Sequence, residues 1–143
     1  MNRREMLALT AVGTLALETV LAQKAPPKAI KLIDLDKIEA KFKPLEFTFE
    51  GTACLLQRVP VPKTATLRAL VVEKEAFSAV SRRCTHVGCQ TELPKTDGVH
   101  VCDCHGSEFD ALGLVLAGPA STPLAAVKLE VREKALWAVS WLA

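Results

Sequence analysis

The chain has 143 residues, a net charge of +2 at pH 7 and hydrophobic side chains at 50% of its positions. This length suits one domain with a modest core, and the hydrophobic content excludes a disordered chain. The small net charge does not indicate a nucleic-acid-binding protein, and the sequence contains neither a P-loop nor a Rossmann glycine motif. The function therefore depends on shorter motifs.

The first 22 residues have the pattern of a targeting segment. Arg3 and Arg4 precede an apolar run that starts at Met6, and small residues up to Ala22 suit a cleavage site. Paired arginines before an apolar run favour a twin-arginine export signal, with an ordinary secretory signal or an amphipathic helix as alternatives. The run 6–22 is barely long enough to span a membrane, so it could also remain as an anchor. Export would place the domain in the periplasm or at the outer face of the cytoplasmic membrane.

Residues 23–28 are polar and contain two prolines, which predicts a linker before a domain at 29–143. In the domain, short apolar or alternating runs are separated by glycine and proline, which is typical of an antiparallel sandwich or barrel. The fold class is therefore all-β, with one helical turn as the alternative near Asp36. The expected strands are 29–35, 45–49, 53–59, 66–72, 77–81, 99–102, 114–117, 126–131 and 136–141.

Two short runs contain four of the five cysteines and two of the three histidines. They are CTHVGC at residues 84–89 and CDCHGSEFD at residues 102–110. Cys84 and His86 are separated by one residue, and Cys102 and His105 by two, so each pair can reach one site from one loop. Two thiolates and two imidazoles suit zinc or an iron–sulfur centre. Because structural zinc sites usually combine pairs of like ligands, the mixed pairs favour iron and sulfur.

The pattern C-x-H followed by C-x2-H resembles the ligand signature of Rieske proteins, in which two histidines replace two cysteines on one iron of a 2Fe–2S cluster. By this resemblance, Cys84 and Cys102 bind one iron, and His86 and His105 bind the other. The resemblance implies an antiparallel β sandwich with a small cluster-binding subdomain at about residues 82–122. It also implies a one-electron carrier that acts as a subunit of an oxidoreductase complex rather than an enzyme alone.

The same resemblance extends to the other cysteines. Cys89 and Cys104 match the positions of a disulfide that ties the two loops together in Rieske proteins of cytochrome bc-type complexes and arsenite oxidases. Export agrees with this pairing, because disulfides persist outside the cytoplasm, whereas two free buried thiols are the alternative. Cys54 lies in an apolar strand and is expected to be a small buried hydrophobe.

Residues near the second loop match positions that tune and cover the cluster in the family. By resemblance, Ser107 donates a hydrogen bond to a bridging sulfide. Phe109 stands where a tyrosine commonly donates to a ligand cysteine, so the lack of a hydroxyl implies a potential below the family's upper range. Gly118 and Pro119 match the loop that covers the cluster, with an ordinary turn as the alternative.

Other conspicuous side chains have structural interpretations. His100 has no cysteine at ligand spacing, so it is interpreted as a structural or solvated histidine. Arg82 and Arg83 are interpreted as a solvated pair, with a contact to an acidic partner as the alternative. Trp137 and Trp141 are an even number of residues apart, which predicts that both lie on one face of the last strand.

The resemblance leaves the partner open. Small subunits of arsenite oxidase resemble this chain in their twin-arginine signal, in SEFD with phenylalanine and in a segment like FEGTACLLQRV, which favours a molybdopterin oxidase large subunit as partner. The alternative is the Rieske subunit of a quinol–cytochrome c oxidoreductase, with quinol and cytochrome b and c subunits as partners. In that group leucine usually follows the first histidine, where this chain has Val87. A stand-alone periplasmic Rieske protein and a zinc module without a redox role are less favoured.

Overall fold

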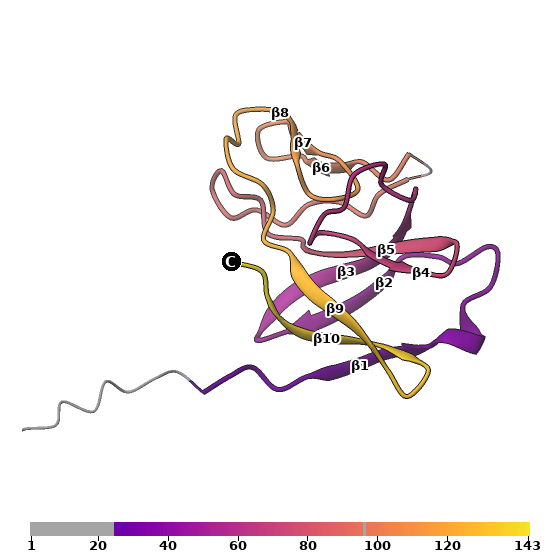
Figure 1. The fold of residues 1–143 in the computed structure, drawn as a ribbon. Helices are drawn as coiled ribbons and strands as arrows, with labels where there is room; N and C mark the ends of the chain where they lie inside the picture. Colours follow the sequence, from indigo (N-terminus) through magenta and orange to yellow (C-terminus); the bar gives the residue numbers. More distant parts are fainter. Residues whose placement is uncertain (1–24, 96) are drawn as a thin grey trace, which may run out of the picture.

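The structure is a computed structural model that describes residues 25–95 and 97–143, and Figure 1 shows its layers. Within these residues the strands form three antiparallel sheets, in the orders β1-β10-β9, β2-β3-β5-β4 and β6-β7-β8. The strands are β1 (Ile30–Asp34), β2 (Leu45–Phe49), β3 (Thr52–Val59), β4 (Leu70–Val72), β5 (Glu75–Ser81), β6 (His100–Cys102), β7 (Ser107–Phe109), β8 (Val115–Ala117), β9 (Val127–Arg132) and β10 (Ala135–Trp141). The first two sheets face each other, and the third lies beyond β5, which confirms the predicted all-β class.

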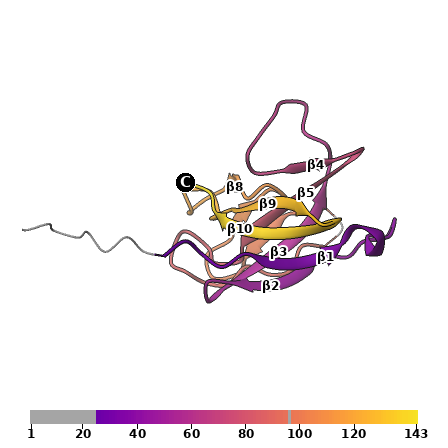
Figure 2. The same cartoon turned by 60° about the horizontal axis from the view of Figure 1, so that its bottom comes forward.

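Three local differences separate the observed elements from the predicted ones. A 3-10 turn, η1 (Leu35–Lys37), follows β1 and confirms the helical alternative near Asp36. The strand expected at 66–72 is paired only over its last three residues, and the connection before it is a long loop that extends away from the two sheets (Figure 2). Strand β7 was not predicted, because it has only three residues and lies inside the second cysteine–histidine run.

The two tryptophans of β10 lie on opposite faces, so the prediction that they share one face is wrong. The register between β10 and β9 shifts by one residue just after Ala138, and such a bulge reverses the alternation of side chains. Trp137 pairs with Glu130 on the outer face. Trp141 instead packs on the sandwich core, with its ring centroid 5.3 Å from that of Phe49.

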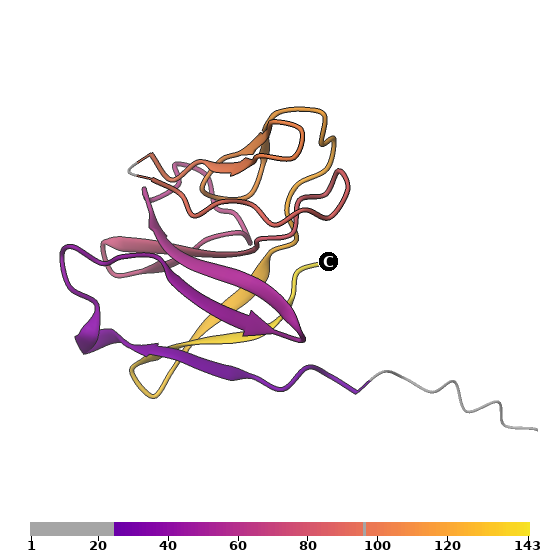
Figure 3. The same ribbon diagram turned by 180° about the vertical axis from the view of Figure 1, so that it is seen from behind.

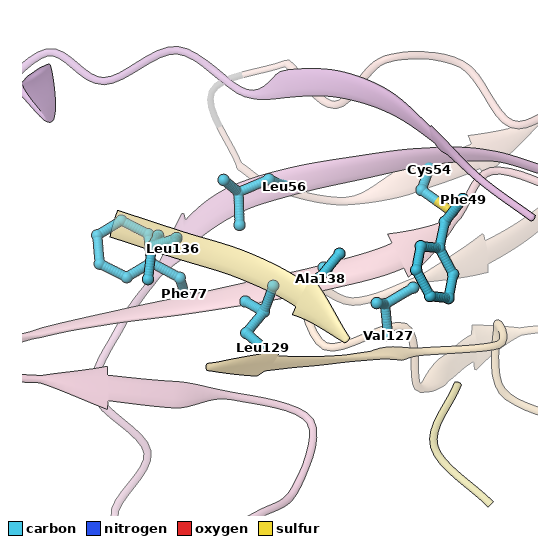
Figure 4. Packing of buried hydrophobic residues seen from close by; sticks show 9 residues of the cluster. Phe49, Cys54, Leu56, Phe77, Val127, Leu129, Leu136 and Ala138 are labelled. Atoms are coloured by element: carbon cyan, nitrogen blue, oxygen red, sulfur yellow. The ribbon is translucent and has the colours of Figure 1, made fainter. Parts of the chain in front are cut away.

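The sandwich core is formed by side chains that point toward one another from the two larger sheets (Figure 4). Its buried members are Phe49, Cys54, Leu56, Phe77, Ala79, Val127, Leu129, Leu136 and Ala138. Full burial of one large apolar side chain stabilises a fold by about 1.5–3 kcal/mol, so this cluster is the main source of the sandwich's stability. Cys54 is fully buried here, and burial raises the pKa of its thiol to about 11, which confirms its interpretation as a small hydrophobe.

Strand β5 is buried on both faces, because it separates this core from a second one. Its residues 76–81 are all buried. Phe77 and Ala79 point into the sandwich core, whereas Val80 belongs to the second cluster, as the alternation of a strand requires. The second cluster lies between β5 and the small sheet, and its members are Val80, Cys84, Cys102, Phe109, Ala120, Leu124 and Ala126. Both predicted ligand cysteines, Cys84 and Cys102, are therefore held by hydrophobic packing.

The predicted targeting segment, residues 1–22, lies outside the described residues, so its type and its cleavage stay predictions. Over residues 25–95 and 97–143, no helix is both long enough and apolar enough to cross a membrane.

A buried polar contact also joins the sandwich to the small sheet. The side-chain amide of Gln57, on β3, donates to the carbonyl of Ala111 at 2.8 Å and lies 3.0 Å from Nε2 of His100. Because the amide nitrogen can only donate, Nε2 of His100 accepts and its proton is on Nδ1. Burial, reinforced by the positive charge of Arg82, lowers the pKa of His100 to about 4, so the ring is neutral. His100 is thus a structural histidine.

The lowered pKa of His100 predicts a loss of stability in mild acid. Below pH 6.5 the unfolded chain binds a proton that the folded chain excludes, so the free energy of unfolding falls as the pH decreases from about 6.5 to 4. The difference between the two pKa values corresponds to ~3 kcal/mol. Urea unfolding between pH 8 and 4 should show this slope in the native protein and a smaller one in His100→Gln. Equal slopes in the two proteins would refute the assignment.

Candidate metal centre

Three loops gather at one end of the small sheet (Figures 1 and 3). The first, residues 82–91, follows β5; the second, residues 103–106, joins β6 to β7; and the third, residues 118–122, follows β8. The first loop contains Cys84 and His86 and the second contains His105, while Cys102 is the last residue of β6, directly before the second loop. The pairing of β7 with β6 and β8 brings the second and third loops together. The first loop joins them through the hydrogen bond from the N–H of Glu92 to the carbonyl of Val101.

The two ligand loops close in the same way. The N–H of Gly88 donates to the carbonyl of Cys84 at 2.9 Å, and the N–H of Gly106 donates to the carbonyl of Cys102 at 2.8 Å. Both glycines have φ near +80°, a conformation that strains residues with a side chain. A glycine four residues after each cysteine therefore allows a tight turn in which each predicted histidine ligand lies.

Sulfur and nitrogen donors differ in their exposure. Cys84 and Cys102 are 2% and 1% exposed, whereas His86 and His105 are exposed at the surface. The two imidazole rings lie side by side, with centroids 4.8 Å apart and planes at 88°. The structure thus places both predicted thiolate donors inside and both imidazole donors at the surface.

The two buried cysteines are close enough to influence each other. Burial, together with a hydrogen bond to the Cys84 thiol, raises the pKa of Cys102. Both are free cysteines, unlike Cys89 and Cys104. The raised pKa disfavours the thiolate form of Cys102, so metal binding at this sulfur would release a proton.

Cys89 and Cys104 form a disulfide between the two ligand loops, with their Cα atoms 6.5 Å apart, which confirms the predicted pairing. Both sulfurs lie within 4.8 Å of the sulfur of Cys102. These three sulfurs do not form a metal site of their own, because two of them are already bonded to each other and carry no thiolate. The disulfide instead ties the loops together directly beside a predicted ligand.

The third loop is tied to the rest of the site by two hydrogen bonds. The N–H of Ala120, just after the cis peptide between Gly118 and Pro119, donates to the buried hydroxyl of Ser107 at 2.9 Å. The hydroxyl of Thr85, in the first loop, donates to the carbonyl of Thr122 at 2.6 Å. The Ser107 oxygen accepts a hydrogen bond from Ala120, so the proton of the Ser107 hydroxyl remains available for another acceptor.

Phe109 lies on the inner side of the same site. It is fully buried on β7 and belongs to the hydrophobic cluster that contains both predicted ligand cysteines. A residue at this position therefore shares one hydrophobic cluster with Cys84 and Cys102.

Arg82 is not solvated, so the interpretation of Arg82 and Arg83 as a solvated pair holds only for the second. Arg82 is 8% exposed, and its guanidinium donates to Glu46 on β2 and to the carbonyl of Thr91. Its own N–H donates to the carbonyl of Ala53, and its carbonyl accepts from Thr91. Arg82 thus fastens both ends of the first ligand loop to the sandwich. The sequence carries no local signal of this burial, because Glu46 is 36 residues away and the other contacts are to backbone groups.

The donor set fits a 2Fe–2S cluster of mixed ligation. It offers two thiols and two imidazoles from two facing loops, with the nitrogen donors adjacent to each other. Ser107 adds a buried hydroxyl whose proton is available. A zinc site would use the same atoms, but it would not account for the division into a buried sulfur pair and an exposed nitrogen pair.

Comparison with known proteins agrees with this site. The model of the Rieske [2Fe-2S] domain family matches residues 31–128. The plasma membrane Rieske protein of the cyanobacterium Synechocystis PCC 6803 superposes with a TM-score of 0.56 and 30% identity, covering 78% of this chain and 98% of that chain. The soluble domain of Rieske protein II from Sulfolobus acidocaldarius shares the fold, with a TM-score of 0.61 at 20% identity over 80% of this chain and 78% of that chain. The chain belongs to the Rieske [2Fe-2S] family of electron-transport proteins.

The curated relatives are longer than the matched region. The cytochrome b6-f complex iron–sulfur subunit 2 of Trichormus variabilis is 40% identical over 62 residues, which cover 43% of this chain and 35% of that protein. The cytochrome b6-f complex iron–sulfur subunit of Prochlorococcus marinus is 36% identical over 75 residues, covering 50% and 42%. The chain therefore matches less than half the length of each.

The disulfide predicts how the cluster is retained. Cys89→Ser should leave the predicted ligands in place but free the two loops from each other, so the cluster should be lost several-fold faster on warming. The measurement is the decay of visible absorbance below the unfolding temperature. Cys54→Ala is the matched control, because it removes a cysteine from the other core and should not change this rate. An unchanged rate in Cys89→Ser would contradict the role of the disulfide.

Proposed function

We propose that Cys84 and Cys102 bind one iron of the 2Fe–2S cluster and that His86 and His105 bind the other. We also propose that the chain transfers single electrons in a complex that oxidises quinol and reduces a cytochrome. The observation that carries the proposal is the pair of exposed, adjacent imidazoles backed by two buried cysteines. When bound, the cluster supplies one-electron redox chemistry.

The protein's own residues determine how a partner reaches the centre. The buried cysteines, packed with Phe109, exclude water from the inner side. The exposed imidazoles offer nitrogen atoms that can hydrogen-bond a quinol and take its proton. Val87, next to His86, is 57% exposed, and an apolar residue beside the imidazoles suits an apolar partner surface or a quinol ring.

The relatives support the quinol–cytochrome branch better than the arsenite-oxidase branch that the sequence favoured. Two of the proteins reported above are subunits of cytochrome b6-f complexes, and a third is a plasma membrane Rieske protein. Cytochrome b and c subunits are accordingly the proposed partners, in place of a molybdopterin large subunit.

We further propose that the domain works in the periplasm or at the outer face of the cytoplasmic membrane, exported by the twin-arginine route. The disulfide supports this location, because such bonds persist in oxidising compartments. A preassembled cluster also requires a route that exports folded proteins, and the paired Arg3 and Arg4 suit that route.

The partner proposal predicts what accompanies the protein. Affinity-tagged full-length chain, purified from gently solubilised membranes of its native organism, should co-elute with b-type haem. The purified material should reduce its cytochrome when quinol is added. Co-elution with a molybdopterin-containing large subunit, without b-type haem, would contradict this branch and restore the arsenite-oxidase interpretation.

The position of Phe109 predicts an effect on the reduction potential. A hydroxyl that donates to a cluster sulfur stabilises the electron-rich reduced form, so Phe109→Tyr should raise the potential. One hydrogen bond of about 0.5–1.5 kcal/mol corresponds to roughly 20–65 mV for one electron. Protein-film voltammetry of both proteins at one pH measures the shift. Phe77→Tyr, in the sandwich core, is the control and should not shift the potential. An equal shift in both variants, or no shift in Phe109→Tyr, would show that residue 109 does not face a cluster sulfur.

A further inference from the structure

Arg82 and Glu46 form an ion pair whose two members differ in exposure. The side chain of Arg82 is 10% exposed, whereas that of Glu46 is 57% exposed, and a 2.5 Å contact joins Nη1 to Oε1. Water screens the exposed carboxylate far more than the buried guanidinium. The pair is therefore not neutral when seen from the interior, where the positive charge dominates.

The guanidinium lies close to the ligand-bearing segments. Arg82 is two residues before Cys84, so their Cα atoms are at most about 7 Å apart. Its Nη2 donates to the carbonyl of Thr91 at 2.6 Å, and the N–H of the same peptide unit, that of Glu92, donates to the carbonyl of Val101 at 2.8 Å. That carbonyl belongs to the peptide that joins Val101 to Cys102. Two hydrogen bonds thus connect the guanidinium of Arg82 to the peptide that precedes Cys102.

Such a chain transmits the charge as polarisation. A cation at the Thr91 carbonyl draws electron density through the first peptide, which makes its N–H a stronger donor to Val101, and the second peptide is polarised in turn. The effect at Cys102 has the same sign as the direct field of the guanidinium. Both favour additional negative charge on the sulfur ligands.

We propose that buried Arg82 is a positioning and tuning residue that raises the reduction potential of the metal centre, and that Glu46 partly offsets it. The inference rests on the proposed ligation by Cys84 and Cys102. Reduction adds one negative charge to the centre, so a buried cation nearby stabilises the reduced form more than the oxidised form. A role in loop packing alone would not give the two members of the pair opposite effects on the potential.

The test compares reduction potentials of the cluster-loaded full-length chain at one pH, with an electron paramagnetic resonance spectrum as the check of ligation. Arg82→Gln should lower the potential, and Glu46→Gln should raise it. We expect Arg82→Gln to change the oxidised-to-reduced ratio at a fixed applied potential by roughly three- to tenfold, and tenfold corresponds to 59 mV. Arg82→Lys keeps the charge and should recover most of the native value.

Arg83→Gln is the matched control, because it removes the same charge one residue closer to Cys84 but from an exposed position. Its shift should be much smaller than that of Arg82→Gln. Equal shifts in the two variants, or a Glu46→Gln protein whose potential does not rise, would overturn the proposal. If Arg82→Gln does not load a cluster, Glu46→Gln and Arg82→Lys still decide the question. A native protein without the Rieske signal would instead overturn the ligation itself.

Discussion

The packing of β5 on two cores is the constraint on which the metal centre depends. Alternate residues of this strand enter the sandwich core and the smaller cluster, so the position of one core fixes that of the other. The chain leaves β5 directly into the first ligand loop, and Cys84 remains in the smaller cluster. The loop therefore starts from a strand whose residues 76–81 are all buried, and apolar packing holds both predicted cysteine ligands.

Polar contacts then restrict what apolar packing leaves free. Arg82 fastens both ends of the first loop, the disulfide joins the first loop to the second, and Ser107 and Thr85 hold the third. The disulfide and the contact of Thr85 each join two different loops, and the contact of Ser107 joins β7 to the third loop, so loosening one of them affects more than one part of the site. Such restraint suits electron transfer, because a centre whose ligands barely move needs little rearrangement when its charge changes.

More details of the site than of the surrounding fold could be predicted from the sequence. The spacing of cysteines and histidines and its family resemblance led to the two loops and to the disulfide between Cys89 and Cys104. The face of Trp141 could not be predicted, because one bulge residue in β10 reverses the alternation and leaves no local signal. The burial of Arg82 was missed for a similar reason. Glu46 is distant from it in the sequence, and the contact with Thr91 is to a backbone carbonyl, which no residue type reveals.

We propose that His86 and His105 bind iron and that His100 does not. Pulsed electron paramagnetic resonance of the reduced, cluster-loaded protein, labelled with ¹⁵N only in histidine, tests this claim directly. We expect two strongly coupled nitrogens in the native protein, two in His100→Gln, and loss of the intact signal in His86 or His105 variants. One coupled nitrogen or none in the native protein, or the loss of a coupling in His100→Gln, would contradict it.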